Sequence, residues 1–128
     1  MESTIVPGVH AVFVHCSDLR VSAKWYCELL ELPYDETAVH SPIFNVPVRE
    51  GVFLTLDDHA FDDTAELVPT NQPTFNLFAH SLYQSYEWVK EKEIQIVREI
   101  EHHENFGWFI IEDPDRNRLM ICGNLEAA

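Results

Sequence analysis

Basic residues are scarce in this chain. Eight Lys and Arg stand against 22 Asp and Glu, which gives a formal charge of −14 over 128 residues. Phosphate backbones are bound by clustered Lys and Arg, so nucleic acid is disfavoured as a partner. A field of this sign attracts cationic ligands, although solubility is the simplest use of a large net charge.

Long apolar runs are also missing. No segment approaches the length of a membrane span, and the N-terminus lacks the basic segment and apolar stretch of an export signal. The odd number of cysteines, Cys16, Cys27 and Cys122, argues against a disulfide framework, and their spacing is not that of a metal site. We therefore expect a cytoplasmic protein without a membrane partner. There is also no Gly-rich phosphate loop and no nucleophile elbow.

The first half of the chain has the pattern of a strand, a helix and further strands. Residues 9–16 alternate as a strand, with Phe13 and His15 on the face turned away from the helix. Asp18 then offers an N-cap oxygen to a helix over residues 19–30. Extended segments are expected at three further places, residues 34–38, 43–48 and 52–56.

The same order recurs in the second half. Ser81 occupies the helix-start position that matches Asp18, so the copies are offset by roughly sixty residues. A strand over residues 74–79, a helix over 82–93 and strands over 94–97, 107–112 and 118–122 are expected. We predict an α+β fold in one domain, residues 1–128, with module 1 at about 7–58, a linker at 59–73 and module 2 at about 74–123.

Two motifs at opposite ends of the repeated unit carry a resemblance to a known family. One is residues 12–19 (VFVHCSDL), followed by Trp25 and Tyr26; the other is the turn at residues 113–117 (DPDRN), usually written with glycine where Arg116 stands. The layout resembles the vicinal oxygen chelate superfamily, which includes glyoxalases, dioxygenases and bleomycin- and fosfomycin-resistance proteins. The resemblance implies two βαβββ modules whose curved mixed sheets surround a concave cavity. We expect Arg116 in a left-handed conformation.

The resemblance also implies where metal ligands would stand. Metal-using members place His, Gln or Glu on the first and last strands of each half. Those positions fall here on Ala11, Thr74 and Met120, and on Leu54 or Thr55. Methyl, thioether and neutral hydroxyl groups are poor ligands for hard or borderline divalent ions. We therefore predict no bound metal and no cofactor.

Two histidines are alternative metal ligands. His10 lies one residue before the implied position, and a one-residue slip of register would turn it inward. His15 shares the face of Ala11, deeper along the strand, and no second donor is evident beside it. The remaining histidines are expected in solvated turns or loops: His40, His59, His80, His102 and His103.

The side chains expected around the cavity are aromatic or apolar, with a few polar groups to orient a ligand. They are Phe13, His15, Asn76, Phe78, Phe106, Trp108, Arg118 and Met120. This lining favours a metal-free binder of an organic small molecule, cationic or aromatic. The alternatives are a metal-dependent lyase or dioxygenase using His10 or His15, and a regulatory domain with a vestigial cavity. Family members commonly pair, so the resemblance implies a homodimer.

Overall fold

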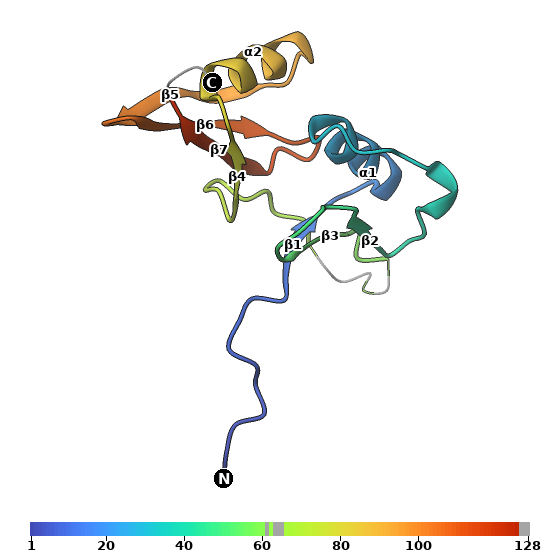
Figure 1. The fold of residues 1–128 in the computed structure, drawn as a ribbon. Coiled ribbons are helices and arrows are strands. Elements are labelled where there is room, and N and C mark those ends of the chain that lie inside the picture. The colour runs from blue at the N-terminus through green and yellow to red at the C-terminus, as the bar shows by residue number, and fades with distance from the viewer. Residues whose placement is uncertain (61, 63–65, 126–128) are drawn as a thin grey trace.

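The computed structural model describes residues 1–60, 62 and 66–125, and it has an α+β fold with two sheets and two α-helices (Figure 1). The elements of the first module are β1 (Ala11–His15), α1 (Leu19–Leu29), the 3-10 helix η1 (Glu36–Ala38), β2 (Ile43–Val46) and β3 (Phe53–Asp57). Those of the second are β4 (Asn76–Ala79), α2 (Leu82–Glu91), β5 (Ile96–His103), β6 (Phe106–Glu112) and β7 (Arg118–Asn124). The predicted fold class is confirmed.

The two sheets repeat one topology. The strand order is β1-β3-β2 in the first sheet and β4-β7-β6-β5 in the second. In each, the opening strand lies at an edge and pairs in parallel with the last strand of its module. Helix α1 packs on β2 and β3, and α2 packs on β6 and β7. Each sheet therefore has one face covered by a helix and one helix-free face, which corresponds to the predicted concave side.

Both helix starts form as their sequences predict. The Asp18 carboxylate accepts hydrogen bonds from the amides of Arg20 and Val21, at 3.1 and 3.2 Å. The Ser81 hydroxyl accepts one from the amide of Gln84 at 3.3 Å. These bonds satisfy amides that have no partner within the helix.

The first module departs from prediction after its helix. Residues 34–38 were expected to be extended, but Glu36–Ala38 form the 3-10 helix η1. The Asp35 side chain accepts hydrogen bonds from the amide and the hydroxyl of Thr37, at 3.0 and 2.7 Å. Such local bonds offer the backbone an alternative to a strand ladder. The first sheet therefore has three strands where the second has four.

The second module departs from prediction in one strand. Strand β5 continues to His103, so His102 and His103 lie at its end and not in a turn as expected. They pair with Gly107 and Phe106 of β6. The described residues of the linker at 59–73 form neither helix nor strand. Among the described helices, none has the length and apolarity that crossing a membrane requires.

The hydrophobic core is shared between the modules. Tyr26 of α1 and Phe109 of β6 are both fully buried in one cluster of apolar side chains. The indole Nε1 of Trp88 on α2 donates a hydrogen bond to the carbonyl of Leu29 on α1, at 3.3 Å. The helices of the two modules are therefore in direct contact.

The turn at residues 113–117 is built by its own side chains. The Asp113 carboxylate accepts hydrogen bonds from the amides of Asp115 and Asn117, each at 2.9 Å. Arg116 has a φ of 65°, which confirms the left-handed conformation expected where relatives use glycine.

This turn also joins the second module to the first through three hydrogen bonds, which we call the inter-module latch. The Tyr26 hydroxyl donates to Asp113 at 2.8 Å, the Ser17 amide donates to Asp115 at 3.0 Å, and the Asn117 side-chain amide donates to the His15 carbonyl at 2.8 Å. Burial raises the pKa of the Asp113 carboxyl, although its hydrogen bonds from Tyr26 and Asn117 oppose that shift. Burial also raises the pKa of the Tyr26 hydroxyl well above its ordinary value.

Candidate functional site

A cavity of about 700 Å³ lies on the helix-free face of the four-stranded sheet. Its walls come from β5, β6, β7 and the end of the linker. The lining residues are Asn71, Gln72, Pro73, Val97, Arg98, Glu101, Trp108, Ile110, Arg118 and Met120. This volume is in the range of cavities that hold small organic molecules.

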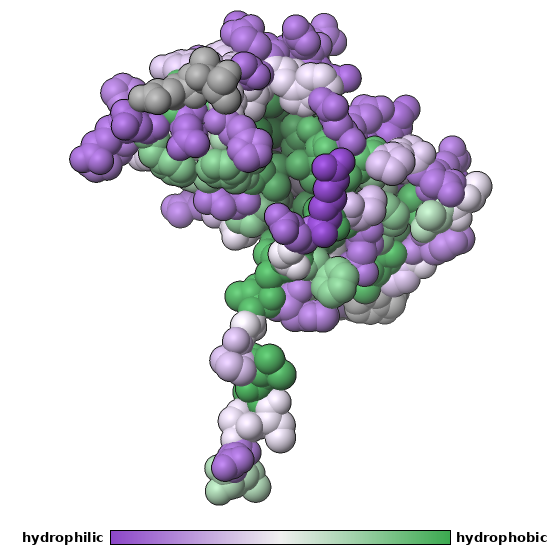
Figure 2. Space-filling model, viewed as in Figure 1, coloured by the Kyte–Doolittle hydropathy of each residue, from purple (hydrophilic) through white to green (hydrophobic). Residues whose placement is uncertain are grey.

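The floor of the cavity is apolar. Ile110 of β6 pairs with Met120 of β7. Trp108 lies two residues before Ile110 on β6, so its side chain points to the same face. Residues paired across antiparallel strands point to the same face, so these three side chains form one surface. In Figure 2 hydrophobic residues extend across the middle of the molecule, with hydrophilic residues around the outer edges.

The rim of the cavity carries charge of both signs. Arg98 forms an ion pair with Glu101, three residues further along β5. Arg118 donates from Nη1 to the carbonyl of Asn71, at 3.2 Å, and has no carboxylate partner among the ion pairs of the described residues. Two of the eight Lys and Arg residues of this acidic chain therefore line one cavity.

A narrow cleft adjoins this cavity where the first module meets the second. Phe13 and His15 of β1 line it together with Thr74, which precedes β4, and Arg118 borders both spaces. Of the side chains predicted to bind a ligand, Trp108, Arg118 and Met120 thus lie in the main cavity, whereas Phe13 and His15 lie in the cleft.

The other three predicted ligand-binding residues line neither the main cavity nor the cleft. Phe78 is 60% exposed and its ring meets the ring of His80 edge-on. Phe106, at the start of β6, is 41% exposed. Asn76 is exposed at the start of β4. Alternation assigned these side chains to the correct face. Asn76 pairs with Met120 of the lining, yet neither Asn76 nor the two phenylalanines line the cavity themselves.

The residues at the family's usual metal positions do not fit a metal ion. Ala11 and Met120 present a methyl group and a thioether, and Thr74 lies in a bend before β4. The Thr55 hydroxyl donates a hydrogen bond to the side-chain oxygen of Asn45, at 2.6 Å. Leu54 is buried on the helix side of its sheet.

The two alternative histidines have different surroundings. His10 is exposed, and its ring meets the ring of Phe53 edge-on with centroids 5.1 Å apart. His15 lies beside Asp57 and His59, and these three make up the one group of metal-type donors found within the described residues. His59 lies in the loop after β3 as expected, but it is not isolated, and the expectation that no second donor lies beside His15 is wrong.

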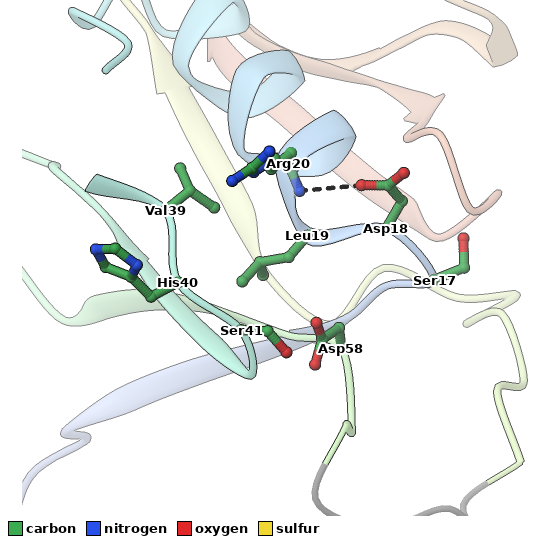
Figure 3. A pocket seen from close by; sticks show the side chains of 8 residues that line it. All are labelled: Ser17, Asp18, Leu19, Arg20, Val39, His40, Ser41 and Asp58. Atoms are coloured by element: carbon green, nitrogen blue, oxygen red, sulfur yellow. Dashed lines mark hydrogen bonds between the residues drawn. The ribbon is translucent and has the colours of Figure 1, made fainter. Parts of the chain in front are cut away.

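A second hollow, of about 460 Å³, lies between the start of α1 and residues 39–41 (Figure 3). Its polar walls include His40 and Asp58. The Asp18 carboxylate at its edge is engaged in capping α1, as the dashed line to Arg20 in Figure 3 marks. Sequence reasoning did not anticipate this hollow.

The three cysteines are free and buried. Burial raises the pKa of the Cys16 thiol to about 12 and raises that of Cys122, which lies on the helix-free side of β7. Thiolate, not thiol, is the nucleophile and metal ligand, so burial disfavours the reactive form of these side chains.

Comparison with known proteins agrees with this geometry. Residues 8–121 match the Glyoxalase/Bleomycin resistance protein/Dioxygenase superfamily. No curated protein matches the chain significantly. The solved structure of a superfamily member from Sphaerobacter thermophilus DSM 20745 is 14% identical, covers 93% of this chain and 98% of its own, and has a TM-score of 0.73.

Two further solved structures share the fold. One is the oxidase ChaP-H2, at 17% identity, 95% coverage of both chains and a TM-score of 0.66. The other is lactoylglutathione lyase from Agrobacterium tumefaciens, at 14% identity, 92% and 94% coverage and a TM-score of 0.65. At such identities structural likeness establishes the fold alone, whereas the sequence match covers most of the chain. The chain belongs to the glyoxalase/bleomycin resistance protein/dioxygenase superfamily.

Proposed function

We propose that this protein binds an aromatic organic molecule carrying an acidic group, in the cavity on the four-stranded sheet. The observation that carries the proposal is the combination of an apolar floor, made by Trp108, Ile110 and Met120, with the Arg118 guanidinium at its rim. An indole ring offers stacking area, and a guanidinium offers paired donors to a carboxylate or phenolate.

The cavity lining favours an acidic ligand over a cationic one. The net charge of the whole chain predicted attraction of cations, but the local charges differ. Glu101 is the carboxylate in the lining, and it is already paired with Arg98. Arg118, which donates a hydrogen bond to the neutral carbonyl of Asn71, is the charge that a ligand would meet.

The same lining favours binding without turnover. Among the described residues around this cavity there is no His, Cys, Ser, Thr, Tyr or Lys, and its carboxylate, Glu101, is held in an ion pair with Arg98. Binding in this place needs no metal ion, because its contacts are stacking and charged hydrogen bonds. A metal-dependent lyase or dioxygenase is the second candidate, favoured by the donor group at His15, Asp57 and His59.

The test is a thermal-shift and fluorescence titration with matched aromatic compounds: benzoate and naphthoate against the corresponding amides and amines. A ligand that binds the native state alone raises the apparent Tm. We expect the carboxylates to bind more tightly than the amides by about tenfold, since a hydrogen bond to a charged group contributes about 1.5–3 kcal/mol.

Variants assign the effect to residues. Arg118→Met should remove the preference for carboxylates, and Trp108→Ala should weaken every aromatic ligand. Arg20→Met is the matched control, because Arg20 is exposed on α1 and lies outside this cavity. It should change neither the preference for carboxylates nor the affinity for aromatic ligands. Equal stabilisation by amines and carboxylates, or the same response in Arg118→Met and Arg20→Met, would refute the proposed ligand class.

We also propose a homodimer in the cytoplasm. Phe13, Phe53 and Phe78 leave large apolar side chains exposed on the described surface, which a second copy of the chain would cover. Three free buried thiols suit a reducing compartment. Light scattering of the purified protein tests the dimer; a monomer at all concentrations would contradict it.

A further inference from the structure

The ends of β1 and β3 bring together two imidazoles and a carboxylate. The strands pair in parallel with His15 opposite Asp57. Neighbouring residues of parallel strands point to the same face, so both side chains lie on the helix-free face of the first sheet. Val14 and Leu56, which alternate with them, are buried in the core on the helix side. The fold therefore fixes two of the three donors through a sheet register and not through a flexible loop.

The third donor is returned to this place by the chain after β3. His59 has a φ of 59°, a left-handed conformation that turns the backbone. Its amide donates to one oxygen of the Asp57 carboxylate at 2.8 Å. Its ring nitrogen Nε2 lies 3.9 Å from the other oxygen of that carboxylate and 2.5 Å from Nδ1 of His15. One Asp57 oxygen thus holds the turn, while the second faces the two rings.

We propose that His15, Asp57 and His59 bind a divalent transition-metal ion. One ligand atom from each residue lies within 4.8 Å of the other two. Two imidazoles and a carboxylate are the ligand types of Zn²⁺ and of Fe²⁺, Co²⁺ or Ni²⁺ sites. In a tetrahedral site with bonds of about 2.0–2.1 Å, ligand atoms stand about 3.3 Å apart, so the two ring nitrogens separate by about 0.8 Å to receive the ion.

Burial and access at this place suit an ion with an open coordination position. The Asp57 side chain is only 7% exposed, and a positive ion compensates a carboxylate that is withdrawn from water. The His59 side chain is 28% exposed, which leaves a path to solvent. Three protein ligands leave at least one position for water or another small molecule, as in catalytic and not structural metal sites.

The first strand is held in place next to the donors. The His15 carbonyl accepts the hydrogen bond of the Asn117 side chain at 2.8 Å, and the Asp57 carbonyl accepts one from the Cys16 amide at 3.0 Å. Groups that orient metal ligands contribute to affinity by restricting their motion.

This site differs from the one that the family's usual ligand positions would form. His15 stands four residues beyond Ala11 on β1. At about 3.3 Å per residue this is about 13 Å along the strand. The proposed site is also distinct from the small-molecule cavity, because none of its three ligands lines that cavity, although His15 lines the cleft that adjoins it.

Cobalt titration of the chelator-treated full chain tests the proposal. We expect one Co²⁺ per chain, with the visible d–d absorption of a four- or five-coordinate ion and competition by Zn²⁺. His15→Ala, Asp57→Asn and His59→Ala should each weaken Co²⁺ binding at least about tenfold. His10→Ala and His40→Ala, which remove histidines outside the group, are matched controls and should bind as the parent does.

Circular dichroism checks that each variant folds. If an alanine variant does not fold, the more conservative variants His59→Gln and Asp57→Asn test the same ligands. The ring nitrogens of His15 and His59 should also shift together in ¹⁵N NMR spectra on addition of Zn²⁺. Absence of stoichiometric Co²⁺ binding would overturn the proposal. So would binding that all three ligand variants retain, or that His10→Ala or His40→Ala abolishes.

Discussion

Asn117→Ala removes the side chain that bridges three parts of the molecule. Its amide nitrogen donates to the His15 carbonyl at 2.8 Å and to the Asp113 carboxylate at 3.1 Å. Its side-chain oxygen accepts from the Thr70 amide at 3.1 Å. Asn117 is 5% exposed, so water does not readily replace these bonds. The substitution therefore tests how strongly the inter-module latch stabilises the fold.

The expected loss follows from the three bonds. Each contributes about 1 kcal/mol to stability, and the one to the Asp113 carboxylate contributes more if that group is ionised. Because the bonds share one side chain, their effects are not fully additive. We expect Asn117→Ala to lower the free energy of unfolding by about 2–4 kcal/mol.

Urea denaturation monitored by tryptophan fluorescence measures this loss. The midpoint should fall while the slope m is unchanged. Asn105→Ala is the matched control, because Asn105 is exposed and contributes its backbone carbonyl to Leu125 at 2.9 Å. It should change stability by less than about 0.5 kcal/mol. If the two variants are equally stable, the latch does not stabilise the fold and the reasoning is refuted.

Two further predictions concern the groups around the latch. Tyr26→Phe removes the hydroxyl that donates to Asp113 at 2.8 Å in the buried core, and it should cost about 1.5–3 kcal/mol by the same urea assay; a loss below about 0.5 kcal/mol would contradict it. Burial raises the pKa of Cys16 from 9.0 to about 12, so the folded state favours the protonated thiol, and the stability this gives is lost as the pH rises from about 9 to about 12. Cys16→Ala should therefore show a shallower fall of unfolding free energy over this range than the parent, and parallel pH profiles would show that Cys16 does not contribute.

Local patterns predicted those parts of the fold that depend on neighbouring residues. Alternation placed Phe13 and His15 on the helix-free face, because the period of a strand is a property of its own backbone. The capping residues Asp18 and Ser81 marked both helix starts for the same reason. The resemblance to the family supplied the pairing of the two modules, which no local pattern contains.

The errors arose where local chemistry or distant pairing decides the structure. Asp35 bonds to Thr37 and forms η1 in place of a strand, an alternative that periodicity does not register. His59 was missed because its neighbours come from the parallel pairing of β1 with β3, more than forty positions apart in sequence, where His15 meets Asp57. The spacing of Asp57 and His59 in the sequence is by itself weak evidence for a metal site. It becomes informative only once the register of β1 against β3 is known.

The reach of the turn at residues 113–117 into the first module also affects how the chain is made. Ser17 and His15 find their partners in that turn 98 and 102 residues later in the sequence. During translation the N-terminal half is therefore synthesised well before the turn at residues 113–117 to which it bonds. Because the Ser17 amide and the His15 carbonyl bond to this late turn, the inter-module latch can form only after residues 113–117 have been synthesised.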